Sequence, residues 1–418
     1  MKVAVVGLGP AGIYAATLLE GAGVEVELFE ALSRPGGRLW TIADESGPLY
    51  DLGGEWIDAD HARCLALIEK QNQLPRKTCG ESLVCYKGEI ASERNLWPDA
   101  TRDAQRIESL AAEYANSPAS APYSIDSSLA RFLNDTCSSE RGRWYAEAYY
   151  RSDEGEDTSK IGLFGWLSGF VNYVGREEGT LSAYRFPGGA GDFFGSILNT
   201  LEAKPRYHSV LQSVKQSNNT VTLSFEGGFE SVADRAIITI PPKCLLNVAF
   251  SPALREEQLN ALHAIGMSRI VKIALCFDSP FWEEMGWNGS MLFDSFAQQT
   301  WHGSLSDKPV LMAYMCGDDS RRILQRQDPI ESVVNEIANV FPRAKTSFLN
   351  ARLYDWATHP FSLGGFSHIP PSVSPQTLTS LRDPNGRVCF AGEHTAEWLG
   401  FIEGALESAE RSVTEVLS

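Results

Sequence analysis

Lys272 is the residue of this sequence whose setting most strongly indicates chemistry. It lies inside the segment RIVKIALCF, where Ile270 and Ala274 flank it on one face of a predicted strand and Val271 and Ile273 occupy the other. A lysine in a strand that is apolar on both faces is costly unless its amine has a partner. The alternative is an edge strand from which the side chain reaches solvent. Lys272 is therefore the first candidate for a catalytic residue.

A second set of residues, near the N-terminus, has a spacing that binds nucleotides. Gly7, Gly9 and Gly12 form the pattern GxGxxG, with Pro10 and Ala11 between the second and third glycines. The first glycine allows a tight turn, the second lets a pyrophosphate approach the backbone, and the third lets a helix pack close to a strand. Phosphate would then lie on the free N–H groups at the start of that helix.

The elements around these glycines are those of a βαβ unit. Residues 3–6 form an apolar run typical of a buried parallel strand, residues 13–19 have a helical composition, and residues 24–29 form a second apolar run. Glu30 closes that run, where a carboxylate can accept a hydrogen bond from a ribose hydroxyl. A glycine turn alone is common, but the strand, helix, strand and acid together predict a dinucleotide site.

Nucleotide-type patterns also occur in the middle and at the end of the chain. Between them lie predicted helices at 102–115, 128–135 and 141–151, of a composition that suits a helical layer around an apolar cavity. This interleaving predicts a two-domain α/β protein whose domains are both discontinuous. A Rossmann-type nucleotide-binding domain would comprise residues 1–75, 185–260 and 375–418, and an α+β substrate domain residues 76–184 and 261–374.

Composition and charge exclude several classes of protein. The 418 residues are 43% hydrophobic, and the formal charge of −17 argues against nucleic acid or an anionic membrane as a partner. The eight cysteines and seven histidines show no metal-binding spacing, so we expect reduced thiols, a cytoplasmic location and no metal. No signal peptide or 18-residue apolar run is expected. The acidic run DEGED, residues 153–157, is predicted to be a solvated loop.

Longer motifs give the sequence a resemblance to a known family. RPGGRLW and YDLGGEW follow the nucleotide unit, and YRFPGGAGDF, IVKIALCFDSPFW, FSLGGFS and FAGEHTAEWLGFIEGALESAER stand further on. In this order they resemble the flavin amine oxidase family, which includes monoamine oxidases, polyamine oxidases and L-amino acid oxidases. The resemblance covers most of the chain, although residues 76 to 180 match only in character. It implies that the nucleotide is FAD.

The resemblance also implies a set of cofactor contacts. Arg38 would neutralise the pyrophosphate, and the backbone of Val210 would bind the adenine edge. Glu393 matches a flavin-contacting motif, and the helix that starts near Ile402 would direct its free N–H groups at the flavin N1 and O2 region. The full set of expected cofactor-binding residues is Gly7, Gly9, Pro10, Ala11, Gly12, Glu30, Gly37, Arg38, Gly54, Glu55, Val210, Gly392, Glu393, Phe401 and Ile402.

The substrate-facing positions depart from the family pattern. Phe366 stands where monoamine oxidases carry the cysteine that bonds to the flavin, so FAD is expected to be non-covalent. Ser367 and Phe401 occupy the two positions of an aromatic cage, which is thus only half aromatic. Trp56 replaces the arginine by which L-amino acid oxidases bind a carboxylate. The expected substrate-pocket residues are Trp56, Phe366, Ser367, Trp398 and Phe401, and Trp166 and Trp356 are further candidates for pocket walls.

Together these residues lead to the hypothesis of an FAD-dependent amine oxidase. A neutral amine would give a hydride from its α-carbon to flavin N5, the imine would hydrolyse, and O2 would be reduced to H2O2. The family counterpart of Lys272 holds a water against flavin N5. Glu55 could bind a second ammonium of a diamine, or it could be a structural carboxylate that is hydrogen-bonded to loop amides.

Three alternatives stay open at this point. An L-amino acid oxidase would need a different arginine, for example Arg185 or Arg151. A desaturase-like or NAD-linked flavoprotein would share the fold without attacking amines, and Lys272 is the feature that discriminates it. A flavin-binding scaffold would have no activity. The sequence names neither the amine nor the oligomeric state, for which a homodimer is one option.

Overall fold

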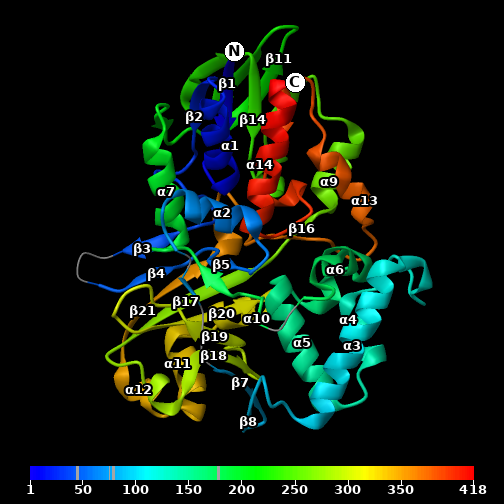
Figure 1. The fold of residues 1–418 in the computed structure, drawn as a ribbon, viewed down its shortest axis with the longest axis vertical. Helices are drawn as coiled ribbons and strands as arrows, with labels where there is room; N and C mark the ends of the chain where they lie inside the picture. Colours follow the sequence, from blue (N-terminus) through cyan, green and yellow to red (C-terminus); the bar gives the residue numbers. More distant parts are fainter. Residues whose placement is uncertain (44–46, 75, 78–80, 177–178) are drawn as a thin grey trace.

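The structure is a computed structural model that describes residues 1–43, 47–74, 76–77, 81–176 and 179–418. A parallel sheet with its helices forms one end of the molecule, and a long antiparallel sheet and a group of helices form the other (Figure 1). Both chain termini lie at the end with the parallel sheet. The predicted domain boundary at residue 75 lies outside the described residues.

The parallel sheet has five strands that come from distant parts of the chain. All four neighbouring pairs are parallel, in the order β10 (Pro205–Arg206), β2 (Glu25–Phe29), β1 (Lys2–Val6), β14 (Arg235–Ile238) and β23 (Val388–Phe390). One face packs against α1 (Pro10–Gly21), α7 (Ala190–Thr200) and α14 (Ile402–Leu417) through a core of aliphatic and phenylalanine side chains. The predicted Rossmann-type unit is therefore confirmed.

A second sheet covers the other face of the parallel sheet. Its order is β13 (Glu230–Ala233), β12 (Val221–Phe225), β11 (Leu211–Gln216) and β15 (Ala249–Ser251). Leu223 and Phe225 of this sheet share a hydrophobic core with Val6 and Phe29 of the parallel sheet. Short helices border the same core: α8 (Pro242–Leu245), α9 (Glu256–Ala264) and α13 (Pro375–Leu378). The parallel strands are thus buried on both faces, as their apolar sequences predict.

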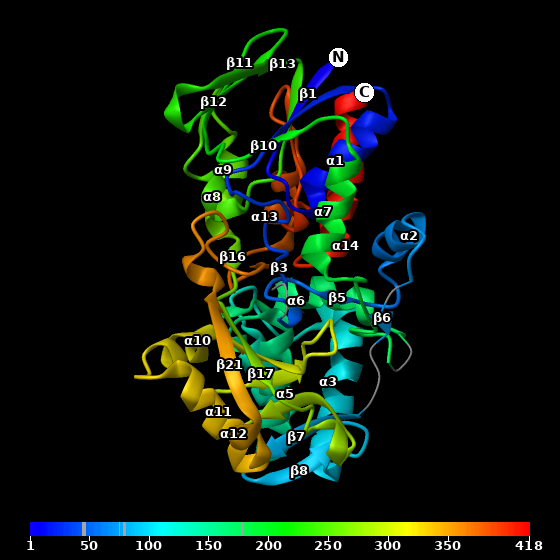
Figure 2. The ribbon, with the colours of Figure 1, turned by 90° about the vertical axis from the view of Figure 1, so that its left-hand side faces the viewer.

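The seven-stranded sheet holds the strand that carries Lys272. Its order is β21 (Phe348–Asp355), β17 (Ile270–Phe277), β20 (Val310–Cys316), β19 (Gln299–His302), β18 (Trp287–Phe293), β7 (Glu81–Tyr86) and β8 (Glu89–Ser92). β17 lies between β21 and β20, and all of its residues are buried. The alternative of Lys272 on an edge strand is therefore wrong. The helices α10 (Gly317–Leu324), α11 (Pro329–Val340) and α12 (Arg343–Ser347) pack beside this sheet (Figure 2).

A layer of helices lies beside this sheet. It comes from residues 76 to 180, whose composition resembles the family but which contain none of its motifs. It comprises α3 (Pro98–Asn116), α4 (Leu129–Thr136), α5 (Glu140–Glu154) and α6 (Leu163–Phe170), which share one apolar core. The three predicted helices are confirmed, each with somewhat different ends. The prediction of a solvated loop at 153–157 is wrong for its first two residues. Asp153 and Glu154 form the end of α5, and Gly155 in the left-handed conformation (φ 66°) terminates the helix.

Three small sheets and one helix lie between the two ends of the molecule. The small sheets pair β3 (Thr41–Ala43) with β4 (Leu49–Asp51), β16 (Gly266–Met267) with β22 (Ser367–His368), and β9 (Tyr184–Arg185) with both β5 (Trp56–Ile57) and β6 (Arg76–Lys77). The helix is α2 (Ala62–Lys70), which packs against α14. The β5–β9 pairing brings the segment after YDLGG beside Arg185. Among the described helices, none has the length and apolar character needed to cross a membrane.

Candidate active site

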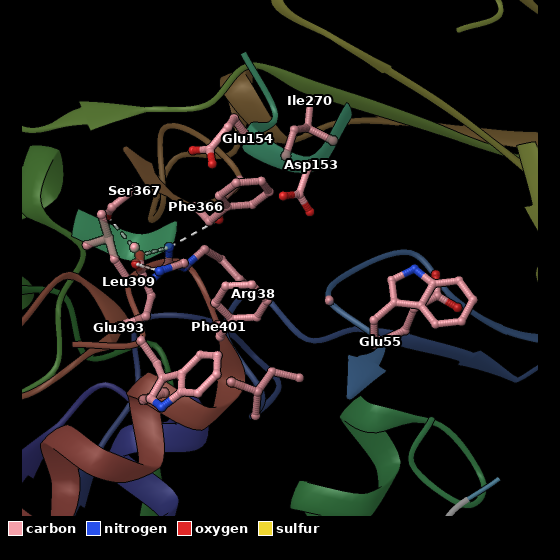
Figure 3. A pocket seen from close by; sticks show the side chains of 18 of the residues that line it. Arg38, Glu55, Asp153, Glu154, Ile270, Phe366, Ser367, Glu393, Leu399 and Phe401 are labelled. Carbon is pink, nitrogen blue, oxygen red and sulfur yellow. Dashed lines mark hydrogen bonds and ion pairs between the residues drawn. The ribbon is translucent and has the colours of Figure 1, made fainter. Parts of the chain in front are cut away.

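One cavity of about 2790 Å³ extends from the glycine-rich turn to the helical layer. Its lining includes the start of α1, Lys272 on β17, the end of α5 and the start of α14. Every predicted site residue except Gly12 lines it. Figure 3 shows part of this cavity, with Arg38, Phe366, Ser367, Glu393 and Phe401 grouped on one side. The structure thus brings together residues that are up to about 400 positions apart in the sequence.

The glycine-rich turn has the backbone geometry that a pyrophosphate needs. Gly7 has φ 95°, and Gly9 is the N-cap of α1 without a capping side chain. Pro10 and Ala11 also line the cavity, so the first turn of α1, whose N–H groups have no partner within the helix, begins at the cavity wall. A Cβ on Gly12 would lie 1.9 Å from the Gly7 carbonyl oxygen. Gly12 therefore packs the helix against the turn rather than contacting the cavity.

Glu30 lies at the end of β2, beside this turn. Its two carboxylate oxygens accept hydrogen bonds from the backbone N–H groups of Leu8 (2.6 Å) and Leu32 (2.9 Å). The side chain is 6% exposed, and burial raises the pKa of its carboxyl despite these hydrogen bonds. Each oxygen keeps a lone pair that can accept from a ribose hydroxyl. The donor set at this end of the cavity therefore fits a dinucleotide.

Arg38 and Glu393 form an ion pair further along the cavity. The Arg38 guanidinium donates to Glu393 Oε1 (2.6 Å) and to the Gly365 carbonyl (3.1 Å). Glu393 also accepts from the Ser367 hydroxyl (2.9 Å) and from the Gly400 N–H (2.7 Å). Burial alone would raise the pKa of Glu393, but the charge and hydrogen bond of Arg38 and the Ser367 hydroxyl bring it below its usual value. The Ser367 hydroxyl is thus committed to Glu393.

Lys272 has the partner that its apolar setting requires. Its ammonium donates to Glu55 Oε1 (2.8 Å) and to the Gly53 carbonyl (2.7 Å), with the Asp51 carbonyl at 3.4 Å. It also lies 5.0 Å from the centre of the Trp301 ring. Lys272 is 5% exposed and lines the cavity. An ammonium has three N–H groups, so one of them stays available toward the cavity or the long contact to Asp51.

Glu55 lies at the centre of this buried network. In addition to Lys272, it accepts from the Arg185 guanidinium (3.0 Å) and the Trp301 indole (3.1 Å), and it is 1% exposed. The hypothesis that Glu55 binds a substrate ammonium does not hold, because two protein cations already share its carboxylate. Its structural partners are these side chains rather than loop amides. Sequence reasoning missed Trp301, whose segment contains no recognisable motif.

The two arginines considered for a substrate carboxylate are both engaged elsewhere. Arg185 donates to Glu55 and to the His302 carbonyl (2.7 Å), and its guanidinium lies 5.0 Å from the centre of the Trp56 ring. Arg151 pairs with Asp319 (3.3 Å) and lines a smaller, separate pocket. Neither arginine is free to bind the carboxylate of an α-amino acid.

Aromatic side chains form much of the remaining wall. The rings of Trp398 and Phe401 are 5.7 Å apart, and both contact His61. Trp56 packs edge-on against Trp301 at 5.8 Å. Phe366, Trp166 and Trp356 also line the cavity, as predicted. The wall can bind an apolar amine, but Ser367 contributes no ring.

Beside this wall, Asp58, Asp60 and His61 each place one potential ligand atom within 4.8 Å of the others. The Arg176 guanidinium pairs with Asp58 (3.0 Å) and Asp60 (2.6 Å), and no ion is needed to balance them.

Asp153 and Glu154 also line the cavity, although sequence reasoning placed them in a loop. A signal for them existed, because Tyr149 and Tyr150 precede them by four residues and therefore lie on the same helix face. Extending the predicted helix by one turn would have placed two tyrosines and two acids toward one surface.

Comparisons with known proteins agree with this geometry. The family described as flavin containing amine oxidoreductase matches residues 10–417. A flavin-containing amine oxidase of Danio rerio is 25% identical over 455 residues, covering 99% of this chain and 85% of that protein. Flavin-containing amine oxidase A of Bos taurus is 24% identical over 452 residues, covering 100% and 85%.

Two solved structures share the fold. Wild-type putrescine oxidase bound to putrescine aligns with a TM-score of 0.89 at 20% identity, covering 100% of this chain and 99% of that one. Cyclohexylamine oxidase from Brevibacterium oxydans IH-35A aligns with a TM-score of 0.89 at 22% identity, covering 99% and 98%. Because the family match spans nearly the whole chain, the resemblance is confirmed: the chain belongs to the flavin-containing amine oxidoreductases, and its cofactor is FAD.

Proposed function

We propose that this protein is an FAD-dependent oxidase that converts the C–N bond of a small amine to an imine, with O2 as the electron acceptor. The observation that carries the proposal is the position of Lys272. Its buried ammonium lines a single cavity that has a nucleotide-binding turn at one end and aromatic walls at the other. In an amine oxidase the reacting carbon, the flavin and a proton-handling group must meet in such an enclosed space.

The nucleotide end supplies the contacts that hold the cofactor. The N–H groups at the start of α1 would bind the pyrophosphate, Glu30 a ribose hydroxyl, and the start of α14 the flavin ring. The ion pair with Glu393 would hold the Arg38 side chain in place beside the cofactor. FAD, when bound, would accept a hydride from the amine α-carbon at N5 and pass two electrons to O2, giving H2O2. No covalent link is expected at Phe366.

The other half of the cavity holds the amine and excludes water. The rings of Trp398, Phe401 and Trp56 line the cavity and would offer apolar surface to a neutral amine, which would orient its α-carbon toward the bound cofactor. Lys272 would hold a water through the N–H group that Glu55 and Gly53 leave available. That water can assist hydrolysis of the imine to an aldehyde.

An L-amino acid oxidase is the weaker candidate. Its substrate carboxylate needs a cation in the cavity, and Arg185 is shared between Glu55 and the His302 carbonyl. The family assignment and Lys272 also favour amine oxidation over a flavoprotein that does not attack amines.

A peroxide-coupled screen of monoamines, diamines, polyamines and L-amino acids on the purified yellow protein tests the proposal. We expect amines to be oxidised and L-amino acids to react more slowly than their decarboxylated amines. Acid precipitation should release the yellow chromophore into the supernatant. Peroxide formation from L-amino acids alone would contradict the proposal, and colour retained in denaturing electrophoresis would contradict the non-covalent link.

The variant Lys272→Met tests the role of the ammonium. We expect FAD to stay bound and turnover to slow by about 10- to 100-fold, because Met fills similar space without a proton-bearing group. Lys243→Met is the matched control: its half-buried amine also donates to two carbonyls, those of Leu262 and His263, but it does not line the cavity. Equal kinetics in both variants would show that Lys272 is structural.

A further inference from the structure

The end of α5 places two carboxylates on the wall of the active-site cavity. Asp153 and Glu154 both line it, and Figure 3 shows them on the opposite side of the Phe366 ring from Arg38 and Glu393. Asp153 is exposed and Glu154 is half-buried, and both side chains line the cavity. The two groups therefore border the space in which a ligand of the cavity would lie.

These carboxylates differ from every other acid described so far in having no partner. In the part of the chain that the structure describes, neither Asp153 nor Glu154 accepts a hydrogen bond or forms an ion pair. The cation whose charge acts on Asp153 is Arg176, which pairs with Asp58 and Asp60. Burial raises the pKa of both carboxyls, and the charge of Asp153 raises that of Glu154 further. A cation in the cavity would relieve this cost.

Aromatic side chains line the same cavity as the two acids, and they indicate the kind of cation. Tyr149 and Tyr150 precede the acids by one helical turn and line the cavity. Their rings continue a series of contacts through Trp166, Phe170 and Tyr173, with centroid distances from 4.9 to 6.2 Å. Ring faces attract organic ammonium groups, whereas Ca²⁺ and Mg²⁺ require a shell of oxygen ligands. This surrounding favours an alkylammonium over a metal ion.

Two observations relate the acids to the part of the cavity that holds Lys272 and Phe366. Gly155, next to Glu154, packs against the tip of the Phe366 ring: a Cβ added there would lie 2.5 Å from Phe366 Cζ. Tyr314 is the strand partner of Lys272 in the β17–β20 register, and the negative charge of Asp153 contributes to raising the pKa of its phenol. Lys272 and the two acids line the same cavity, so an extended ligand could contact both.

From this arrangement we infer that Asp153 and Glu154 bind a second cationic nitrogen of the substrate, so that the preferred substrates are linear diamines or polyamines. The inference rests on the proposed amine oxidase function. One nitrogen, in its neutral form, would lie beside Lys272 for oxidation, while the distal ammonium would neutralise the acid pair. Glu55 cannot take this part, because Lys272 and Arg185 occupy its carboxylate.

The test compares substrates that differ only in the distal nitrogen. The kcat/KM values of 1,4-diaminobutane and longer α,ω-diamines are measured against n-alkylamines of the same chain length, on the FAD-loaded protein. The variants are Asp153→Asn and Glu154→Gln, made separately and together. Glu140→Gln is the matched control, because it removes one negative charge from the same helix at an exposed position that does not line the cavity.

We expect the wild type and the control to prefer the diamine. In each acid variant, kcat/KM for the diamine should fall by about 10- to 100-fold, mainly through KM, while that for the monoamine stays within about twofold. A diamine-to-monoamine ratio that is unchanged in both variants, or that falls equally in the control, would overturn the inference.

A binding measurement separates this inference from the proposed function. A saturating diamine should raise the melting temperature of the wild type and not that of the double variant, whether or not oxidation occurs. If no amine is oxidised but this difference is found, the proposed function fails and the cation site stands. If amines are oxidised but the diamine shifts both proteins equally, the site fails and the proposed function stands.

Discussion

The two halves of the active-site cavity differ in whether their carboxylates have partners. In the half that faces the nucleotide-binding domain, three buried acids have partners: Glu30 has two backbone N–H groups, Glu393 has Arg38, and Glu55 has Lys272 and Arg185. In the half that faces the helical layer, Asp153 and Glu154 have none among the described residues. The first half is assembled before any ligand arrives, whereas the second lacks the charge that would complete it.

This difference indicates which part of the cavity can tolerate changes of side chain. An uncompensated carboxylate destabilises the free protein, so it persists only where function favours it. The paired half fixes the groups that every reaction cycle needs in one position. The unpaired half can change its preferred substrate through one or two side chains without disturbing the core.

The variant Glu55→Gln should have the largest effect on the paired half. It leaves the charges of Lys272 and Arg185 buried without their carboxylate, which should lower the free energy of unfolding by about 3 to 5 kcal/mol. Denaturant unfolding measures this loss, and Glu140→Gln is the control: it loses only interactions with Lys87 and Tyr86 at an exposed position, and it should lower the free energy of unfolding far less. Catalysis by the residual folded protein should fall equally for monoamines and diamines. A selective loss of diamine oxidation would indicate that Glu55 binds the substrate after all.

The variant Gly12→Ala should rank second. Its Cβ would approach the Gly7 carbonyl oxygen to 1.9 Å, so the turn must open, at a cost of about 3 kcal/mol and with loss of FAD. Gly21→Ala in the same helix is the control, because nothing lies within 4 Å of its added Cβ. Flavin absorbance per protein and the melting temperature report both effects. Full FAD content in Gly12→Ala would show that the turn adapts.

Lowering the pH should weaken the fold through three buried histidines. Burial, reinforced by the charges of neighbouring cations, lowers the pKa of His359, His368 and His394 to about 4. Below pH about 6.5 these imidazoles bind protons in the unfolded chain but not in the folded chain. Each one therefore lowers the free energy of unfolding by about 1.4 kcal/mol per pH unit between pH about 6.5 and 4. The raised carboxyl pKa values of Asp153 and Glu154 act in the opposite direction, since the folded state then binds more protons.

Unfolding curves recorded from pH 7 to pH 4.5 measure this slope. The variant His368→Gln should reduce the slope of the free energy of unfolding against pH by the contribution of one imidazole. His263→Gln, at an exposed position, should leave this slope unchanged. An identical slope in both variants would mean that His368 titrates normally in the folded protein.

The smallest effect is expected in the unpaired half, and it has the opposite sign. Asp153→Asn removes a carboxylate that has no partner among the described residues, so the free energy of unfolding should rise at pH 7.5, by no more than about 0.5 kcal/mol because solvent screens the exposed Asp153. The melting temperature of the ligand-free protein checks this, with Glu140→Gln as the reference. A drop comparable to that of Glu55→Gln would mean that Asp153 has a partner in the free protein, and the contrast between the halves would disappear.

Much of the nucleotide-binding half could be predicted because its signals are local. The turn from Gly7 to Gly12, the helix that follows and Glu30 all lie within the first 30 residues, and turn chemistry and hydrophobic periodicity act over just such distances. The apolar run around Lys272 likewise predicted a buried strand. The longer motifs then predicted the family, which the comparisons confirm.

The charge partners could not be predicted, because the tertiary structure alone decides which strands and helices meet. Glu55 is separated by 130 residues from Arg185 and by 217 from Lys272, and nothing within either segment indicates the other. The acids of DEGED have the composition of a solvated loop, and only the packing of α5 beside the Phe366 loop turns two of them into the cavity. By itself, then, the sequence determined the nucleotide site and the buried lysine, since both depend on neighbouring residues. The fold decided which acids have a partner and which have none among the described residues, since pairing depends on distances between parts of the chain that are remote in sequence.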